Sequence, residues 1–331
     1  MKHVSIIIPE GDAILSSIVG PYKVFKHVNQ YLAAHTPKAS PFYDLHLVGL
    51  HKSHRLYNGL FSIHPNKCIG EVKNTDLVII PAFYGEIDRH IALNKAFYPW
   101  LKRMHSGGAE LASLCVGAFF LASTGLMDGK RCTTHWASAS AFREMFPKVE
   151  LIEEKVITDE KGIYSSGGAY SFLNLILHLV EKFNGREIAL WCAKMFEAEI
   201  DRVSQLPFAI FQGQKTHADE PVKKAQVFIE SNIGEKISIE QLANRFALSR
   251  RNFIRRFKKA TQNTPIEYLQ RVRIEAAKKS LESSDEPISE VMFKVGYSDR
   301  KAFRNVFRKI TGLTPLEYKL RYNRELALAY S

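Results

Sequence analysis

The last third of the chain contains an internal repeat, and no other feature of the sequence constrains the fold as strongly. The segment FIRRFKKATQNTPIEYLQR begins at Phe253, and the segment FRNVFRKITGLTPLEYKLR begins 50 residues later at Phe303. Nine of the nineteen aligned positions are identical. A repeat of this size indicates one supersecondary unit that is used twice.

Each copy of the repeat predicts two short helices joined by a turn. In the first copy, Ser238 and Gln241 have the spacing of a capping box, and Ser249 is placed to cap the next helix. In the second copy, residues 288–295 are expected to form the first helix, and Asp299 caps the second. Two short helices with a turn of about three to four residues between them form a helix-turn-helix.

A third helix is predicted to follow each helix-turn-helix. Thr-Pro-x-Glu occurs at Thr264 and again at Thr314. The threonine is a favoured N-cap, proline is favoured at the first helical position, and the glutamate can reach back to the N-cap backbone. Both copies therefore start their third helix in the same way.

The second helix of each unit is predicted to carry a cationic outer face. Phe253 and Phe257 are i,i+4 neighbours that must face the core. Residues on the opposite face can enter the major groove, where Arg and Lys read guanine and Asn reads adenine. The predicted DNA-binding residues are Arg251, Arg255, Lys258, Lys301, Arg304, Asn305 and Arg308. Residues nearer the flanks are expected to meet phosphates: Arg250, Arg256, Lys259, Arg300, Arg304 and Lys309.

The charge distribution supports a nucleic-acid partner for this region. The whole chain has a net charge of +12, and residues 221–331 hold 23 Lys and Arg residues against 12 Asp and Glu residues. Nearly all of the excess positive charge therefore lies in the last third. Such an asymmetry indicates a polyanion as the partner of that third.

Residues 222–322 resemble the DNA-binding domain of the AraC/XylS transcription regulators. The most specific part is GYSDRKAFRNVFRKITGLTPLEYKLRY, from Gly296 to Tyr322. The chain departs from the family pattern at Met292, where a small alanine is usual. The resemblance implies two helix-turn-helix units joined by a long helix, here about residues 265–281. It also implies that both recognition helices enter successive major grooves of double-stranded DNA.

The first two thirds of the chain alternate strand patterns with helix patterns. This alternation predicts an α/β domain with a parallel sheet flanked by helices, over residues 1–200, followed by a linker over residues 201–221. An all-α domain with the two helix-turn-helix units then occupies residues 222–322. Strands are expected at residues 4–9, 43–50, 76–83 and 110–115, with a hairpin at 156–166. Helices are expected at residues 21–34, 87–105, 118–124, 169–184 and 186–200.

Cys115 ends one of the predicted strands and is followed by Val116, Gly117 and a predicted helix. This order is typical of a nucleophile elbow, which exposes a side chain at a sharp strand-to-helix turn. A helix start is expected to lower the pKa of the thiol and to supply backbone amides for an oxyanion. With GLMDG at residues 125–129 and TTHW at 133–136, residues 3–200 resemble the class I glutamine amidotransferase-like (PfpI/ThiJ) superfamily. The closer resemblance is to the version that is fused to AraC-type DNA-binding domains.

The catalytic residues of that superfamily are incomplete here. Its amidotransferases need a carboxylate two residues after the histidine, where this chain has Ala137 after His135. PfpI-type proteases carry histidine directly after the cysteine, where this chain has Val116. We therefore predict no catalytic residues and no enzyme, but an effector pocket. Its predicted residues are Asp12, Cys115, Val116 and His135.

The sequence thus predicts a cytoplasmic transcription regulator that binds double-stranded DNA and forms a homodimer. A small-molecule effector is expected in the N-terminal domain, and the resemblance suggests a nitrogenous metabolite. No cofactor, no metal and no membrane association are predicted, because the chain has no CxxC or HExxH motif and no long apolar run. Three alternatives stay open: a dimerisation-only N-terminal domain, a cysteine-dependent hydrolase or lyase tethered to DNA, and a redox sensor.

Overall fold

The computed structural model describes residues 1–35 and 40–323, and the chain divides into two units, Met1–Gln205 and Leu206–Ser331. The first unit is organised by a seven-stranded sheet in the order β10-β11-β7-β6-β1-β2-β5. All its neighbouring strands pair in parallel except β10, which runs antiparallel to β11. The strands are β1 (Lys2–Ile7), β2 (Tyr43–Gly49), β5 (Lys67–Cys68), β6 (Leu77–Ile80), β7 (Glu110–Leu114), β10 (Ile157–Glu160) and β11 (Ile163–Ser166).

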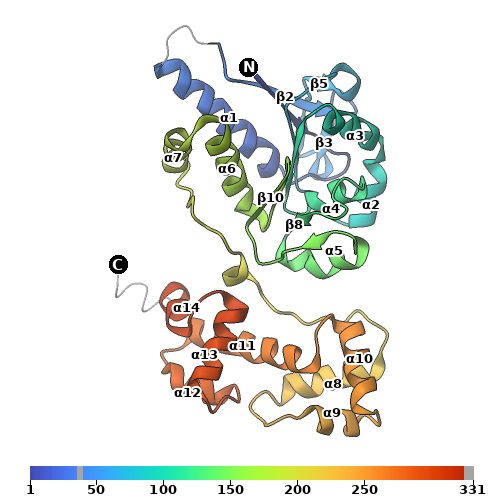
Figure 1. Cartoon of the computed structure of the whole chain (residues 1–331), viewed down its shortest axis with the longest axis vertical. Coiled ribbons are helices and arrows are strands. Elements are labelled where there is room, and N and C mark those ends of the chain that lie inside the picture. Colours follow the sequence, from blue (N-terminus) through green and yellow to red (C-terminus); the bar gives the residue numbers. More distant parts are fainter. Residues whose placement is uncertain (36–39, 324–331) are drawn as a thin grey trace. The chain divides into compact units, whose positions relative to one another are not determined.

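Helices cover both faces of this sheet (Figure 1). One face carries α1 (Ser16–His35), α6 (Phe172–Asn184) and α7 (Arg186–Met195). The other carries α2 (Ile87–Leu93), α3 (Tyr98–Ser106), α4 (Gly117–Ser123) and α5 (Ala139–Met145). The predicted α/β class is confirmed, because apolar strands buried on both faces need helices on both sides.

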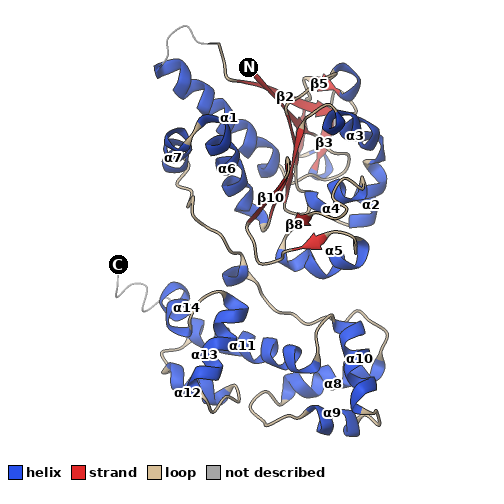
Figure 2. Ribbon diagram, viewed as in Figure 1, coloured by secondary structure: helices blue, strands red, loops and turns tan. Residues whose placement is uncertain are grey.

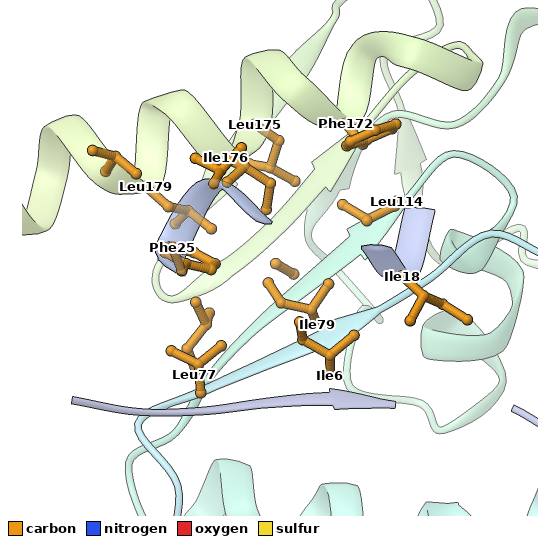
Figure 3. Close-up of a cluster of buried hydrophobic side chains, with 14 of the residues drawn as sticks. Ile6, Ile18, Phe25, Leu77, Ile79, Leu114, Phe172, Leu175, Ile176 and Leu179 are labelled. Atoms are coloured by element: carbon orange, nitrogen blue, oxygen red, sulfur yellow. The ribbon is translucent and has the colours of Figure 1, made fainter. Parts of the chain in front are cut away.

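The core on the first face brings together side chains from strands and helices that are far apart in sequence (Figure 3). Ile6, Ile79 and Leu114 point from three adjacent strands toward Phe25 of α1 and Phe172 of α6. These five side chains are at most 3% exposed. The packing fixes β7, and hence the turn at its end, against both helices.

Small elements complete the first unit (Figure 2). β3 (His54–Leu56) pairs with β4 (Phe61–Ile63) as a hairpin, and β8 (Arg131–Cys132) pairs with β9 (Glu150–Leu151). Neither pair was predicted, because each strand has only two or three residues and shows no period. Short 3-10 helices occur in this unit at Tyr57–Gly59, Ile69–Glu71, Lys95–Phe97, Trp136–Ser138 and Ala169–Ser171, and a further one, Leu206–Phe208, lies in the second unit.

The helix predicted over residues 87–105 is interrupted. It consists of α2 and α3, with the 3-10 turn Lys95–Phe97 between them. Pro99 lies in the first turn of α3, where its missing N–H costs nothing, whereas a continuous helix would place it in the interior. The buried side chain of Asn94 also binds both backbone groups of Glu10, at 2.8 and 3.0 Å. Proline and this long-range pairing together end α2.

The second unit is helical and contains two cores joined by one long helix. α11 (Pro265–Ser283) supplies Tyr268 and Leu269 to the first core and Ile274 and Leu281 to the second. The first core also contains α8 (Glu220–Ser231), α9 (Ile239–Arg245) and α10 (Arg250–Thr261). The second contains α12 (Ile288–Lys294), α13 (Arg300–Thr311) and α14 (Pro315–Tyr322). Met292, the departure from the family pattern, is buried in the second core.

Much of the segment predicted as a linker, residues 201–221, packs against one unit or the other. Gln205 is 2% exposed within the first unit. In the second unit, the ring of Phe211 lies 5.2 Å from that of Tyr268, edge to face. The buried Nζ of Lys278 donates to the carbonyl of Ala209 at 2.6 Å. The loss of periodicity therefore marks irregular backbone here, not a segment without contacts.

Among the helices of the described residues, none combines the length and the apolar character that are needed to cross a membrane.

Candidate nucleic-acid interface and effector site

The first helix-turn-helix is built by the capping and packing that the sequence predicts. The Ser238 side chain and Gln241 form a capping box at the start of α9, and the Ser249 side chain accepts from the backbone N–H of Asn252 at the start of α10. Phe253 and Phe257 are fully buried, with ring centroids 5.5 Å apart. The opposite face of α10 is consequently left in solvent.

The second helix-turn-helix repeats this construction. Asp299 accepts from the backbone N–H of Ala302 and caps α13, and the rings of Phe303 and Phe307 lie 5.7 Å apart in the core. Capping boxes at Thr264 and Thr314 start α11 and α14. The repeat in the sequence therefore corresponds to a repeat of backbone geometry.

The seven predicted DNA-binding residues all have exposed side chains on α10 and α13: Arg251, Arg255, Lys258, Lys301, Arg304, Asn305 and Arg308. Their exposure leaves the positive groups accessible to a polyanion. Within the described part of the chain, the one side-chain hydrogen bond of this group is internal to α10, where Nη2 of Arg255 donates to the side chain of Asn252 at 3.0 Å. Their contacts with bases remain a prediction.

Arg256, one of the residues predicted to meet phosphates, has a partner within the fold. Its Nε and Nη2 donate to the two carboxylate oxygens of Asp219, both at 2.8 Å. Asp219 also caps α8 through the backbone N–H of Val222. The hydrogen bond from Arg256 is the main cause of a lowered pKa of Asp219. Arg256 therefore holds α10 to the start of α8, and its contact with phosphate remains a prediction.

Cys115 occupies the predicted elbow between β7 and α4. Its backbone φ of +54° is in the left-handed region, which residues other than glycine rarely adopt. The backbone N–H of Cys115 donates to the carbonyl of Ser166 at 3.1 Å, and the Thr134 hydroxyl donates to the Cys115 carbonyl at 2.9 Å. A methyl group on Gly117 would lie 2.6 Å from the carbonyl oxygen of Pro81, so α4 can begin here only with glycine.

The electrostatics of the elbow differ from the prediction. Burial raises the pKa of the Cys115 thiol to about 11, whereas the helix start was expected to lower it. That prediction is wrong because the thiol is only 3% exposed and α4 has only seven residues. Loss of hydration therefore outweighs the partial charge of a short helix. Val116, the next pocket residue, is half-buried at the N-cap of α4.

His135 and Asp12 do not complete a catalytic set with this thiol. The Nδ1 of His135 accepts from the backbone N–H of Ala137 at 3.1 Å, and burial lowers the pKa of the imidazole. Within residues 1–35 and 40–323, no carboxylate pairs with the His135 ring, and burial is the one cause of its pKa shift. Asp12 accepts from the backbone N–H of Tyr57 at 2.8 Å and so holds the β3–β4 hairpin. Asp12, which the sequence assigns to the effector pocket, thus binds the segment of the β3–β4 hairpin.

Comparison with models of protein families shows which family the chain belongs to. A model of the DJ-1/PfpI family matches residues 7–182, which is more than half of the sequence. The chain belongs to the DJ-1/PfpI family. A model described as a helix-turn-helix domain matches residues 242–321. Both resemblances inferred from the sequence, the PfpI-type domain and the AraC-type helix-turn-helix domain, are thereby confirmed.

Relatives of this DJ-1/PfpI chain are named as regulators. The HTH-type transcriptional regulator GbdR of Pseudomonas aeruginosa is 26% identical over 76% of this chain and 68% of its own length. The HTH-type transcriptional activator RhaS of Escherichia fergusonii is 36% identical over 30% of this chain and 36% of its own length. These names agree with the prediction of a regulator and not an enzyme.

Among solved structures, a ThiJ/PfpI family protein from Pseudomonas syringae superposes with a TM-score of 0.50. It is 15% identical, and the alignment covers 70% of this chain and 86% of the other. At this identity the comparison supports the fold alone.

Sequence reasoning missed Gln205, which lies beside the elbow of the DJ-1/PfpI unit. Its Nε2 donates to the carbonyl of Thr134 at 2.9 Å and to that of Glu153 at 2.6 Å, and its Oε1 accepts from the N–H of Gly168 at 3.0 Å. Thr134 binds the Cys115 carbonyl, so Gln205 is one hydrogen-bonded residue away from the elbow. A glutamine in a segment without periodicity gives no sequence signal for such a position.

Proposed function

We propose that this chain is a transcription regulator that binds specific sites on double-stranded DNA through α10 and α13. The observation that carries the proposal is the duplicated helix-turn-helix, in which each second helix buries a phenylalanine pair and exposes a cationic face. The names of the relatives support the same function. A regulator of this kind acts in the cytoplasm and, by the symmetry usual for DNA-binding proteins, as a homodimer.

The test of DNA binding is selection of binding sites from random duplex DNA by the full-length chain. Arg251→Ala and Lys301→Ala are then measured on the selected site and on single-base variants of it. We expect each substitution to relax the preference at particular base pairs by about 1–3 kcal/mol. Lys102→Ala removes an exposed charge from the DJ-1/PfpI unit and is the matched control. Equal weakening on every sequence would assign Arg251 and Lys301 to phosphates instead.

The second part of the proposal concerns control of DNA binding. We infer that a small molecule, such as a nitrogenous metabolite, binds near Asp12, Cys115, Val116 and His135 without being converted. A buried thiol with a raised pKa and a histidine without a carboxylate partner favour binding over catalysis. The same raised pKa argues against a redox sensor, since oxidation starts from the thiolate.

The effector is sought by thermal unfolding of the full-length chain against a panel of metabolites. A ligand at 100 times its Kd stabilises the unit that binds it by about 2.7 kcal/mol. We expect the shift in the parent chain and its loss in Cys115→Ala, which removes the thiol, with Cys192→Ala as a control at a buried cysteine of α7. An effector must also change the affinity for DNA. A ligand that binds the DNA-competent and DNA-incompetent states equally well shifts no equilibrium between them. DNA binding that is indifferent to every ligand would support a dimerisation-only domain.

A further inference from the structure

Two neighbouring strands of the DJ-1/PfpI unit bring three metal-ligating side chains together. β1 and β2 pair in parallel, with His3 aligned to Asp44. Asp44 and His46 are two residues apart on β2, so both project from the same face as His3. His3 and Asp44 are the second residues of β1 and β2, and His46 lies in the middle of β2, whereas Cys115 follows the end of β7. The cluster is therefore separate from the elbow.

The three side chains converge on one small volume. Nδ1 of His3 lies 3.0 Å from Oδ2 of Asp44, and Nε2 of His46 lies 3.4 Å from the same oxygen. All three ligand atoms lie within 4.8 Å of one another. Ligands of a tetrahedral zinc ion are about 3.3–3.5 Å apart, given bonds of about 2.0–2.1 Å. The two separations to Asp44 are close to that geometry, and the two histidine nitrogens are at most 4.8 Å apart.

The position of the cluster allows an ion to enter from solvent. The side chains of His3, Asp44 and His46 are 44%, 34% and 19% exposed. Further along the same face, Ile7 and Val48 are fully buried in the core. The polar end of this face is thus open to solvent on one side and closed by apolar packing on the other, which leaves room for water as a fourth ligand.

We propose that His3, Asp44 and His46 form a binding site for a divalent transition-metal ion such as Zn²⁺. Two imidazoles and one carboxylate suit zinc and its neighbours in the first transition row, whereas Mg²⁺ and Ca²⁺ require more oxygen ligands. A bound ion joins β1 to β2 through side chains, in addition to their backbone hydrogen bonds. The site goes beyond the proposed function, since neither DNA reading nor an effector at Cys115 requires it.

The sequence prediction of no metal rested on motifs that describe helical and loop sites. A site on a sheet has another signature, which is alternate residues of one strand and an aligned residue of its neighbour. Asp-Leu-His at residues 44–46 has the alternate spacing, but the alignment with His3 depends on strand register. Only the structure supplies that register.

The test is a zinc titration of the full-length chain without a histidine tag, in competition with a chromogenic chelator. We expect a single zinc ion per chain, and binding weakened at least about tenfold by His46→Ala and by Asp44→Asn. His178→Ala is the matched control, because His178 lies 3.4 Å from Asp159 in a pair that has no second histidine. Equal affinity in the parent chain and the cluster variants would overturn the proposal and leave a metal-free hydrogen-bonded cluster.

Cobalt substitution gives an independent readout. Co²⁺ bound by nitrogen and oxygen ligands in the parent chain is expected to show d–d absorption without a sulfur-to-cobalt charge-transfer band. A charge-transfer band would assign the ion to a cysteine and contradict the site.

Thermal unfolding separates binding from folding. The parent chain is expected to unfold at a higher temperature with Zn²⁺ than without, and His3→Gln, which alters the most exposed member, is expected to fold normally but lose this shift. A shift that persists in His3→Gln and His46→Ala would also overturn the site. DNA binding by these variants is measured in parallel, so failure of the metal site is distinguishable from failure of the proposed regulator.

Discussion

At the scale of single residues, burial determines the chemistry of Cys115. Its thiol has a pKa of about 11, so about one molecule in a thousand carries the thiolate at pH 8. We predict slow alkylation of Cys115 by iodoacetamide at pH 7–8, with a rate that rises about tenfold per pH unit toward pH 11. Mass spectrometry of the native chain measures the rate for each cysteine. Cys68, which is partly exposed, serves as the internal reference. Rapid alkylation of Cys115 at neutral pH would indicate a reactive thiol and reopen the enzyme and redox alternatives.

A second residue-scale prediction separates an arginine that stabilises the fold, Arg256, from one that is predicted to contact DNA, Arg255. Arg256 holds the carboxylate that caps α8, whereas Arg255 is exposed one position earlier on α10. We expect Arg256→Ala to lower the free energy of unfolding of the second unit and Arg255→Ala to leave it nearly unchanged, because only Arg256 is paired with the carboxylate that caps α8. Chemical denaturation provides the measurement.

The same pair gives a pH dependence with a definite sign. The pKa of Asp219 is lowered in the folded chain, so the pair stabilises the fold above the unfolded pKa of about 3.9. This stabilisation is lost as the pH falls through the lower, folded pKa. The stability difference between the parent chain and Arg256→Ala should therefore shrink below about pH 4. A difference that stays constant down to pH 2 would exclude the ion pair as its cause.

At the scale of elements, the two copies of the repeat differ at one helix end. α13 ends at Gly312 with a φ of +75°, and α10 ends at Gln262 with a φ of +59°. A side chain in this left-handed position costs free energy that glycine avoids. We expect Gln262→Gly to stabilise the second unit by about 0.5–1 kcal/mol and Gly312→Gln to destabilise it by a similar amount. Denaturant midpoints of the two variants test this, and changes of the opposite sign would show that the side chain of Gln262 contributes contacts of its own.

Elements with local signals could be predicted from the sequence, and elements set by distant contacts could not. The helix starts at Ser249, Asp299, Thr264 and Thr314 follow from residues within one turn, and the structure has each cap. The break between α2 and α3 depends partly on Asn94 meeting Glu10, which is 84 residues away in sequence. The features of the candidate effector site also fall into these two groups, those with local sequence signals and those set by distant contacts. The turn at Cys115 follows from its neighbours, but the raised pKa of its thiol and the position of Gln205 depend on what packs around them.

At the scale of the whole molecule, the boundary of the DNA-binding unit lies before α8. The second unit begins at Leu206, whereas the resemblance to AraC-type DNA-binding domains begins at residue 222. Residues between these positions cover Tyr268 with the ring of Phe211 and satisfy buried Lys278 with the carbonyl of Ala209. The backbone N–H of Phe211 also donates a hydrogen bond to the carboxylate of Glu275 at 3.1 Å. The segment is thus part of the fold of the second unit.

We therefore predict that a fragment of residues 206–331 is more stable than one of residues 222–331, by about 2 kcal/mol or more. The shorter fragment lacks Phe211 and therefore exposes the ring of Tyr268 to water. It also lacks the Ala209 carbonyl, so the Lys278 ammonium, which is 4% exposed, keeps Glu275 as its remaining partner. Urea denaturation of both fragments measures the difference. Phe211→Ala in the longer fragment separates ring packing from the Lys278 hydrogen bond, because it removes only the former. If both fragments unfold at the same denaturant concentration, residues 206–221 are a tether that does not stabilise the second unit.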